Sequence, residues 1–227
     1  MKQINKNQKQ PLADIAYETI VRKIISLEYQ PSQHLEENQL VEDLGIGRTP
    51  IREALVRLRS EKMLHSHPNK GVVVRPITIQ NAKAMFESME IIELGIAELS
   101  MNKEITHFLQ EMEQANKMLK DALGENDTFG LTEANHMFHM SFAKCSHNEF
   151  LCRAENEVRN EAKRLSFLSY DNILDPETPL KNHFDSVINE HNEIITCLRG
   201  KDKDRLKKVI IKHIQTFKER IILFMTS

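Results

Sequence analysis

The feature that most constrains the fold is the stretch Leu44-Gly-Ile-Gly-Arg-Thr-Pro-Ile-Arg-Glu-Ala-Leu-Val-Arg-Leu58. It predicts the end of a short helix, a glycine-containing turn and a second helix. The second helix has an apolar stripe with the three- and four-residue spacing of a buried face, made of Ile51, Ala54, Leu55 and Leu58. Arg48 and Arg52 lie four residues apart on another face. A helix-turn-helix has this division, because one face packs on the domain and the other enters a major groove.

The flanking segments extend this motif to a winged helix-turn-helix. Apolar residues at helical spacing predict a first helix over residues 12–27, and the short helix before the turn covers 36–44. Residues 64–75 read as two short strands around a His-Pro-Asn-Lys-Gly turn, which is typical of a hairpin. The tip of this wing holds Lys70, a partner for a phosphate, and Gly71, which lets the backbone approach DNA closely.

The rest of the chain has no strand pattern. Its periodicity and breaks predict six helices, near residues 78–101, 104–123, 127–146, 149–169, 179–199 and 202–225. Short links between helices favour an antiparallel bundle. We therefore expect a mainly α protein with a disordered arm (1–10), a winged helix-turn-helix domain (11–76) and an all-helical domain (78–227).

Composition narrows the class of protein. The 227 residues contain no apolar run of the roughly 18 residues that span a bilayer, and no secretory segment follows the basic start, so we expect a cytoplasmic protein. Three cysteines without metal-site spacing indicate free thiols. Residues 1–78 carry 12 basic against 9 acidic side chains, and the remainder 19 against 24. This asymmetry supports a nucleic-acid reader on an acidic body.

Two motifs carry candidate chemistry, and each has a plainer alternative. Arg48 and Arg52 could be a solvated helix face, but the turn, the apolar stripe and the wing in the expected order favour DNA contacts. In the helical part Asn135 and His139 share one helix face, and His191 and His213 lie 22 residues apart on two helices joined by a short link. Three imidazoles and one oxygen donor suit a divalent metal. The alternative is that they are core histidines satisfied by hydrogen bonds.

The chain resembles a known family in both parts. Residues 44–58, with Glu36-Glu-Asn-Gln-Leu40 before them and Gly71 after them, resemble the winged-helix domain of the GntR family of bacterial transcription regulators. The helical part is similar to the effector-binding (FCD) domain of the family's FadR-type branch. Its landmarks are Asn135-His-Met-Phe-His139, Glu190-His191-Asn-Glu-Ile-Ile195 and His213.

The resemblance implies roles for these residues. The DNA contacts would be Arg48, Thr49, Arg52 and Gly71, with Lys70 added as a phosphate partner, and the metal ligands Asn135, His139, His191 and His213. It implies a homodimer that reads an inverted repeat and a divalent ion such as zinc, nickel or manganese. The effector would be a small molecule, with a carboxylate the chemistry that a metal with open positions favours.

This chain departs from the family pattern at four positions. Gly47 replaces the usual Ser or Thr before the recognition helix, and Asn38 stands where many relatives have Arg. Asn135 replaces an Asp, so the metal site has one charge less. Met89 stands where many relatives present an Arg to the pocket, so Arg159 or Arg164 would have to supply that charge.

The sequence therefore predicts a DNA-binding transcription regulator, more specifically a repressor, controlled by a small metabolite in the helical domain. The rival is a metal-dependent enzyme with an accessory N-terminal domain, because three histidines can activate a water molecule. Neither a base beside the candidate ligands nor a nucleophile motif or phosphate loop is recognisable in the sequence. We therefore expect no enzymatic activity.

Overall fold

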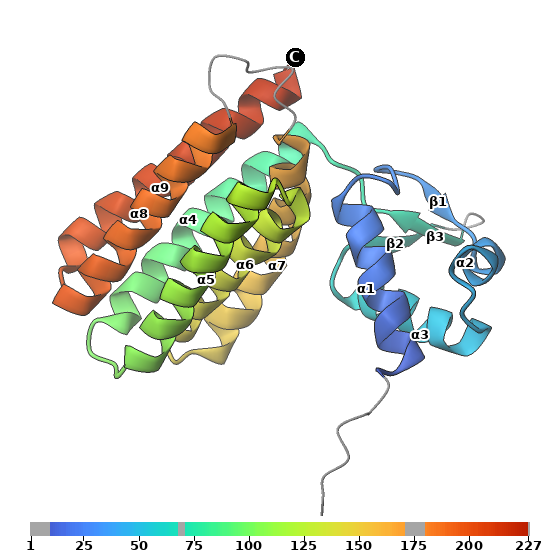
Figure 1. The fold of residues 1–227 in the computed structure, drawn as a ribbon, viewed down its shortest axis with the longest axis horizontal. Helices are drawn as coiled ribbons and strands as arrows, with labels where there is room; N and C mark the ends of the chain where they lie inside the picture. Colours follow the sequence, from blue (N-terminus) through green and yellow to red (C-terminus); the bar gives the residue numbers. More distant parts are fainter. Residues whose placement is uncertain (1–9, 68–70, 171–179, 227) are drawn as a thin grey trace, which may run out of the picture. The chain divides into compact units, whose positions relative to one another are not determined.

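A computed structural model describes residues 10–67, 71–170 and 180–226 (Figure 1). The chain divides into two compact units, Met1–Pro76 and Ile77–Ser227. Almost all of the arm expected to be disordered, and the wing residue Lys70, lie outside the described residues. Among the described helices, none is long and apolar enough to cross a membrane.

The first unit is a winged helix-turn-helix. Its elements are α1 (Leu12–Ile25), β1 (His34–Leu35), α2 (Glu37–Leu44), α3 (Arg48–Ser60), β2 (Leu64–His67) and β3 (Gly71–Val74). The sheet has the antiparallel order β1-β3-β2, with Leu35 opposite Val72 and Leu64 opposite Val74. The hairpin of β2 and β3 is the predicted wing. Strand β1 was not predicted, because a strand of two residues has no periodicity to detect.

Apolar stripes on α1 and α3 build the core of this unit. Ile20 and Ile24 on α1 and Ile51 and Leu58 on α3 are fully buried, and the two helices pack on each other. Val74 closes the core from the sheet and is also fully buried. Packing of this face fixes the orientation of α3 and leaves its other face exposed.

The second unit consists of helices side by side (Figure 1). They are α4 (Ile79–Ser100), α5 (Thr106–Glu125), α6 (Thr128–Lys144), α7 (Glu149–Leu168), α8 (Leu180–Gly200) and α9 (Lys203–Thr226). Side-chain caps begin four of them: Thr78 accepts from the Asn81 amide, Asp127 from Gly130, Asn148 from Phe150 and Leu151, and Asp202 from Arg205. Such caps satisfy amide groups that have no partner within the helix.

Contacts between the helices bury a long apolar core. Met89 and Ile96 of α4, Met112 of α5, and Phe138 and Phe142 of α6 are fully buried in it. Helix α9 packs on α4 and on α8, while α6 packs on α5 and α7. The expected fold class, mainly α with an N-terminal winged helix-turn-helix and a C-terminal helical bundle, is confirmed. This bundle brings side chains of α6, α8 and α9 to one point in its interior.

Candidate functional site

The recognition helix α3 begins directly after a tight turn. Gly45 adopts a left-handed conformation (φ 62°), which an L side chain adopts only at a cost. Gly47 occupies the N-cap position of α3 in an extended conformation and provides no side-chain hydrogen bond. The turn therefore depends on one glycine for its backbone, while the other leaves a capping position unused.

Two arginines leave α3 toward solvent and meet the start of α2. The Nε of Arg52 donates to both carboxylate oxygens of Glu37, at 2.9 Å each. The Nε of Arg48 lies 3.4 Å from Oε1 of the same Glu37, and its Nη2 donates to Oδ1 of Asn38 at 2.8 Å. Thr49 is exposed beside them. The two predicted DNA-contacting arginines thus share one carboxylate in this structure.

The wing lies against the same groove. Gly71 has φ 71°, and a Cβ built there would lie 3.1 Å from Nε2 of His34. Both conditions disfavour any other residue at this position. Gly71, His34, Glu37, Arg48 and Arg52 line one open groove of about 450 Å³. Within this unit, the predicted contacts on α3 and on the wing therefore face a common space.

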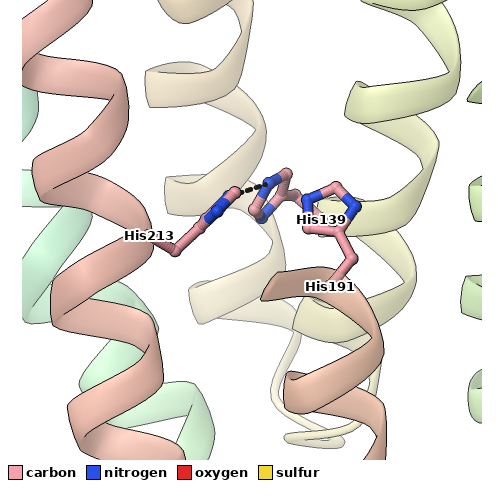
Figure 2. Close-up of side chains that lie close together, drawn as sticks. All are labelled: His139, His191 and His213. Carbon is pink, nitrogen blue, oxygen red and sulfur yellow. Dashed lines mark hydrogen bonds between the residues drawn. The ribbon is translucent and has the colours of Figure 1, made fainter. Parts of the chain in front are cut away.

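The predicted histidines come together in the interior of the second unit (Figure 2). His139 comes from α6, His191 from α8 and His213 from α9, and all three are buried. One ring nitrogen of each lies within 4.8 Å of the other two. The Nε2 atoms of His139 and His213 are 3.3 Å apart, the contact that Figure 2 marks with a dashed line. The helical spacing and the 22-residue separation thus identified residues that do converge.

Partners on the outer nitrogens fix which ring atoms face inward. The Nδ1 of His213 lies 2.9 Å from Oε2 of Glu190, and the Nδ1 of His191 lies 2.8 Å from Oδ1 of Asn116. Both partners are acceptors, so Nδ1 carries the proton and the lone pair of Nε2 points to the centre. Such outer partners are the usual support of metal-bound histidines.

The third histidine lies beside a buried acid that was not predicted from the sequence. The Nδ1 of His139 lies 3.2 Å from Oε1 of Glu93, a fully buried residue of α4. Glu93 also pairs with the guanidinium of Arg159, which is held 2.6 Å from Glu155. Glu93 lies in the apolar stripe that holds Met89 and Ile96. A charge within a buried stripe was the signal that could have found it.

The donor set fits a divalent metal ion. The Nε2 atoms of His139 and His213 share a hydrogen bond of 3.3 Å at the centre, and a divalent ion bound there would replace that hydrogen bond with two metal–nitrogen bonds. The Nε2 of His191 is buried and has no hydrogen-bond partner. Burial lowers the pKa of His139, His191 and His213, so each imidazole is neutral, as metal ligation requires. His139, His191 and His213 would hold such an ion.

A small cavity adjoins this centre. Its volume is about 30 Å³, and its lining includes His213, Asn135, Met89 and Arg159. This is room for about two water molecules. Asn135 thus lines the cavity one helical turn before His139, as its spacing predicts. Of the two arginines considered for an anionic ligand, Arg159 lines the cavity, while Arg164 is buried and lies 3.5 Å from Glu161.

Known proteins resemble this chain over almost its whole length. Residues 12–74 match the bacterial regulatory proteins of the gntR family, and residues 84–216 match the FCD domain. The HTH-type transcriptional repressor RspR of Escherichia coli is 20% identical, over 95% of this chain and 91% of its own. The Nta operon transcriptional regulator of Aminobacter aminovorans is 26% identical, over 87% of this chain and 89% of its own.

Solved structures share the fold. The structure of E. coli McbR/YncC matches 96% of this chain and 99% of its own, with a TM-score of 0.75 at 20% identity. Matches to both domains in the expected order leave no support for the enzyme alternative. The chain belongs to the GntR family, among the members with an FCD domain, and is a DNA-binding transcription regulator with an effector-binding domain.

Proposed function

We propose that this regulator is a repressor whose binding to DNA is controlled by a small organic acid, which binds in the helical unit beside a divalent metal ion. The observation that carries this proposal is the convergence of three buried, neutral imidazoles, with one Nε2 left without a partner. Zinc, nickel and manganese are the candidate ions. The repressor assignment is supported by relatives with that name, such as the gluconate operon transcriptional repressor of Bacillus licheniformis, 22% identical over 82% of this chain and 75% of its own.

The DNA contacts in this proposal come from the groove of the first unit. Arg48 and Arg52 pair with guanine through O6 and N7, which accept two hydrogen bonds from one guanidinium. Thr49 and the wing residue Lys70 bind phosphates, and Gly71 lets the wing backbone approach the duplex. Two copies of the chain form a cytoplasmic homodimer and read an inverted repeat, since two-fold symmetric proteins bind symmetric sites.

The metal-site ligands in this proposal are His139, His191, His213 and the amide oxygen of Asn135. A divalent ion held there supplies Lewis-acidic positions that attract a carboxylate. Arg159 adds a guanidinium on the wall of the same cavity. Its charge is shared with the buried Glu93, so an acid gains from Arg159 only where it competes with that carboxylate.

The size of the cavity sets how the ligand acts. A space of about 30 Å³ is too small for an acid of several carbons. Binding therefore requires that side chains such as Met89 and Phe217, which line the cavity, move apart. A ligand that prefers the expanded form shifts the population toward it, and this difference in affinity is what alters DNA binding.

The experiment measures metal content and DNA binding in the same gently purified samples. The wild-type chain is compared with His139→Ala and His191→Ala, and with His107→Ala as the matched control, because the side chain of His107 is 76% exposed on α5. We expect about one ion per chain in the wild type and the control, and none in the two site variants. Binding of a selected operator is followed with and without a panel of small carboxylates.

Two results would contradict the proposal. A wild-type chain that takes up no ion after incubation with zinc, nickel and manganese in turn would show that the histidines are a hydrogen-bonded core. An ion content unchanged in both site variants would place the metal elsewhere. In either case DNA binding by Arg48 and Arg52 would still stand and could be tested separately.

A further inference from the structure

The N-terminal end of α2 places one carboxylate between the two arginines of the recognition helix. Glu37 is the first residue of α2, and it bonds to Arg52 at 2.9 Å and approaches Arg48 at 3.4 Å. The side chain of Glu37 is 29% exposed, whereas those of Arg48 and Arg52 are 59% and 63% exposed. The carboxylate is thus the more buried partner, and the guanidinium groups extend past it toward solvent.

The contacts of Glu37 with the two arginines use the Nε nitrogen of each guanidinium group. Glu37 binds Arg52 through Nε, and no other contact to a described residue occupies the two terminal nitrogens of that guanidinium. The terminal nitrogens are the donors that pair with O6 and N7 of guanine. Arg48 is held differently, by Glu37 at Nε and by Asn38 at Nη2. Arg52 is therefore fixed at its inner nitrogen with its outer edge free.

The shared carboxylate also changes the charge that DNA meets. Two guanidinium groups with one carboxylate between them have a net charge of +1 rather than +2. Attraction to phosphates depends on that charge and is the same for every sequence. Contacts to base edges depend on where the terminal nitrogens lie and so distinguish sequences. Glu37 weakens the attraction to phosphates and orients the arginine nitrogens that contact base edges.

We propose that Glu37 is a specificity-determining residue, which positions Arg52 for a guanine edge and restrains both arginines from binding phosphates indiscriminately. This inference rests on the proposed role of Arg48 and Arg52 as DNA contacts. A purely structural role would be different: an acidic residue in the first turn also stabilises α2 through the helix dipole. That role would affect folding, but it would not change the preference between two DNA sequences.

The test compares variants on two duplexes. The full-length wild-type chain first selects its preferred duplex from a random pool, and a scrambled duplex of the same composition is the second probe. Affinities for both are measured at several salt concentrations for the wild type, Glu37→Gln and Glu37→Asp. The matched control is Glu42→Gln, which removes the same charge from an exposed position on α2.

We expect Glu37→Gln to bind the scrambled duplex more tightly and the selected duplex no better, so that the ratio of the two affinities falls about tenfold or more. The salt dependence on the scrambled duplex becomes steeper by about one unit of slope. Glu37→Asp keeps the charge but shortens the reach, so it lowers affinity for the selected duplex alone. Glu42→Gln changes both affinities by the same factor.

An unchanged affinity ratio in Glu37→Gln, with a melting temperature equal to that of the wild type, would overturn the inference. A lower melting temperature with the wild-type ratio would show the structural role instead, and would overturn it equally. The double variant Arg48→Ala/Arg52→Ala separates this failure from that of the proposed function. If the double variant still distinguishes the two duplexes, the arginines are not the DNA contacts.

Discussion

The three histidines of the helical unit are held by three different outer partners. Glu190 neighbours His191 in the sequence but bonds to His213, while Asn116 supports His191 from another helix. Glu93, on α4, lies beside His139. The hydrogen bonds of Glu190 and Asn116 hold the Nδ1 atoms of His213 and His191, so the Nε2 atoms of these two rings face the same point. Three residues from three helices therefore surround the histidines, and Arg159 of a fourth helix pairs with one of them, Glu93.

The substitution of an amide for a carboxylate at position 135 leads to a prediction at the residue scale. Asn135→Asp adds a negative charge beside the imidazoles, so we expect it to tighten binding of Zn²⁺ at least about tenfold, or ~1.4 kcal/mol. Competition with a fluorescent chelator measures the affinity. Asn102→Asp, an exposed change of the same charge, serves as the control. An affinity unchanged by Asn135→Asp would show that position 135 is not a ligand.

Residue-scale prediction from sequence succeeded where helix geometry is regular. The distance from His191 to His213 along two helices, and the spacing of Asn135 and His139, are enough to place side chains on facing surfaces. The outer partners were not predictable in this way. Glu93 comes from a helix that is distant in sequence, and its buried pairing with Arg159 depends on how α4 and α7 pack.

At the scale of elements, the turn between α2 and α3 uses its two glycines differently. Gly45 has a left-handed backbone conformation. Gly47 is extended and occupies the N-cap position of α3, where a residue with a capping side chain is usual. A Cβ on Gly47 would find its nearest neighbour, Cδ of Pro50, at 4.0 Å, so space is not the constraint there. Only one of the two positions requires glycine.

This difference predicts opposite effects of the same substitution. Gly45→Ser should lower the free energy of unfolding of the first unit by about 1 kcal/mol or more, because a side chain is strained at φ 62°. Gly47→Ser should raise it by a few tenths of a kcal/mol, since serine can cap α3. Urea unfolding followed by tyrosine fluorescence measures both, because two of the three tyrosines, Tyr17 and Tyr29, lie in this unit. Equal effects at both positions would contradict this account.

Helices were easier to predict than strands in this chain. Long periodic segments fixed the existence and order of the helices, and their ends differ from the expected ones by a few residues, as for α1, which ends at Ile25 rather than residue 27. Strand β1 was missed because its pairing with β3 is decided by tertiary contact. The wing tip around Lys70 lies outside the described residues, so its predicted contact remains a prediction.

At the scale of the whole molecule, the two units differ in what they bury. Among the described residues, every buried charged side chain lies in the second unit, in a set that includes Glu93, Glu155, Arg159, Arg164 and Glu190. The first unit has an apolar core and keeps its charges on the surface. A scaffold that only presents a helix needs no interior charge, whereas a binding centre does.

Tyrosine ionisation gives a prediction for the whole chain. Burial raises the pKa of Tyr17 and Tyr29 above the usual 10, and raises the pKa of Tyr170 to about 12. These are the three tyrosines of the chain. As the pH rises, each of these tyrosines loses its proton in the unfolded chain before it does so in the folded protein. The buried, protonated tyrosines therefore add their full contribution to the free energy of unfolding below pH 10, and this contribution is lost as the pH rises above 10.

The measurement is absorbance of tyrosinate at 295 nm beside circular dichroism, from pH 8 to pH 12. We expect little tyrosinate at pH 10 while the helical signal is native, and a steep rise when that signal falls. A full titration near pH 10 with the helices intact would contradict the buried environments of Tyr17 and Tyr170. The protein unfolded in urea provides the reference curve for tyrosine ionisation.

The convergence of three helices on one point has a topological consequence. His139, His191 and His213 are separated by 52 and 22 residues along the chain, so a single ion bound to all of them closes two loops at once. In the chain-entropy treatment of cross-links, loops of these lengths each restrict the unfolded ensemble by about 3 to 4 kcal/mol. Such an ion would act as a reversible cross-link, and its binding would make α6, α8 and α9 open together rather than one at a time.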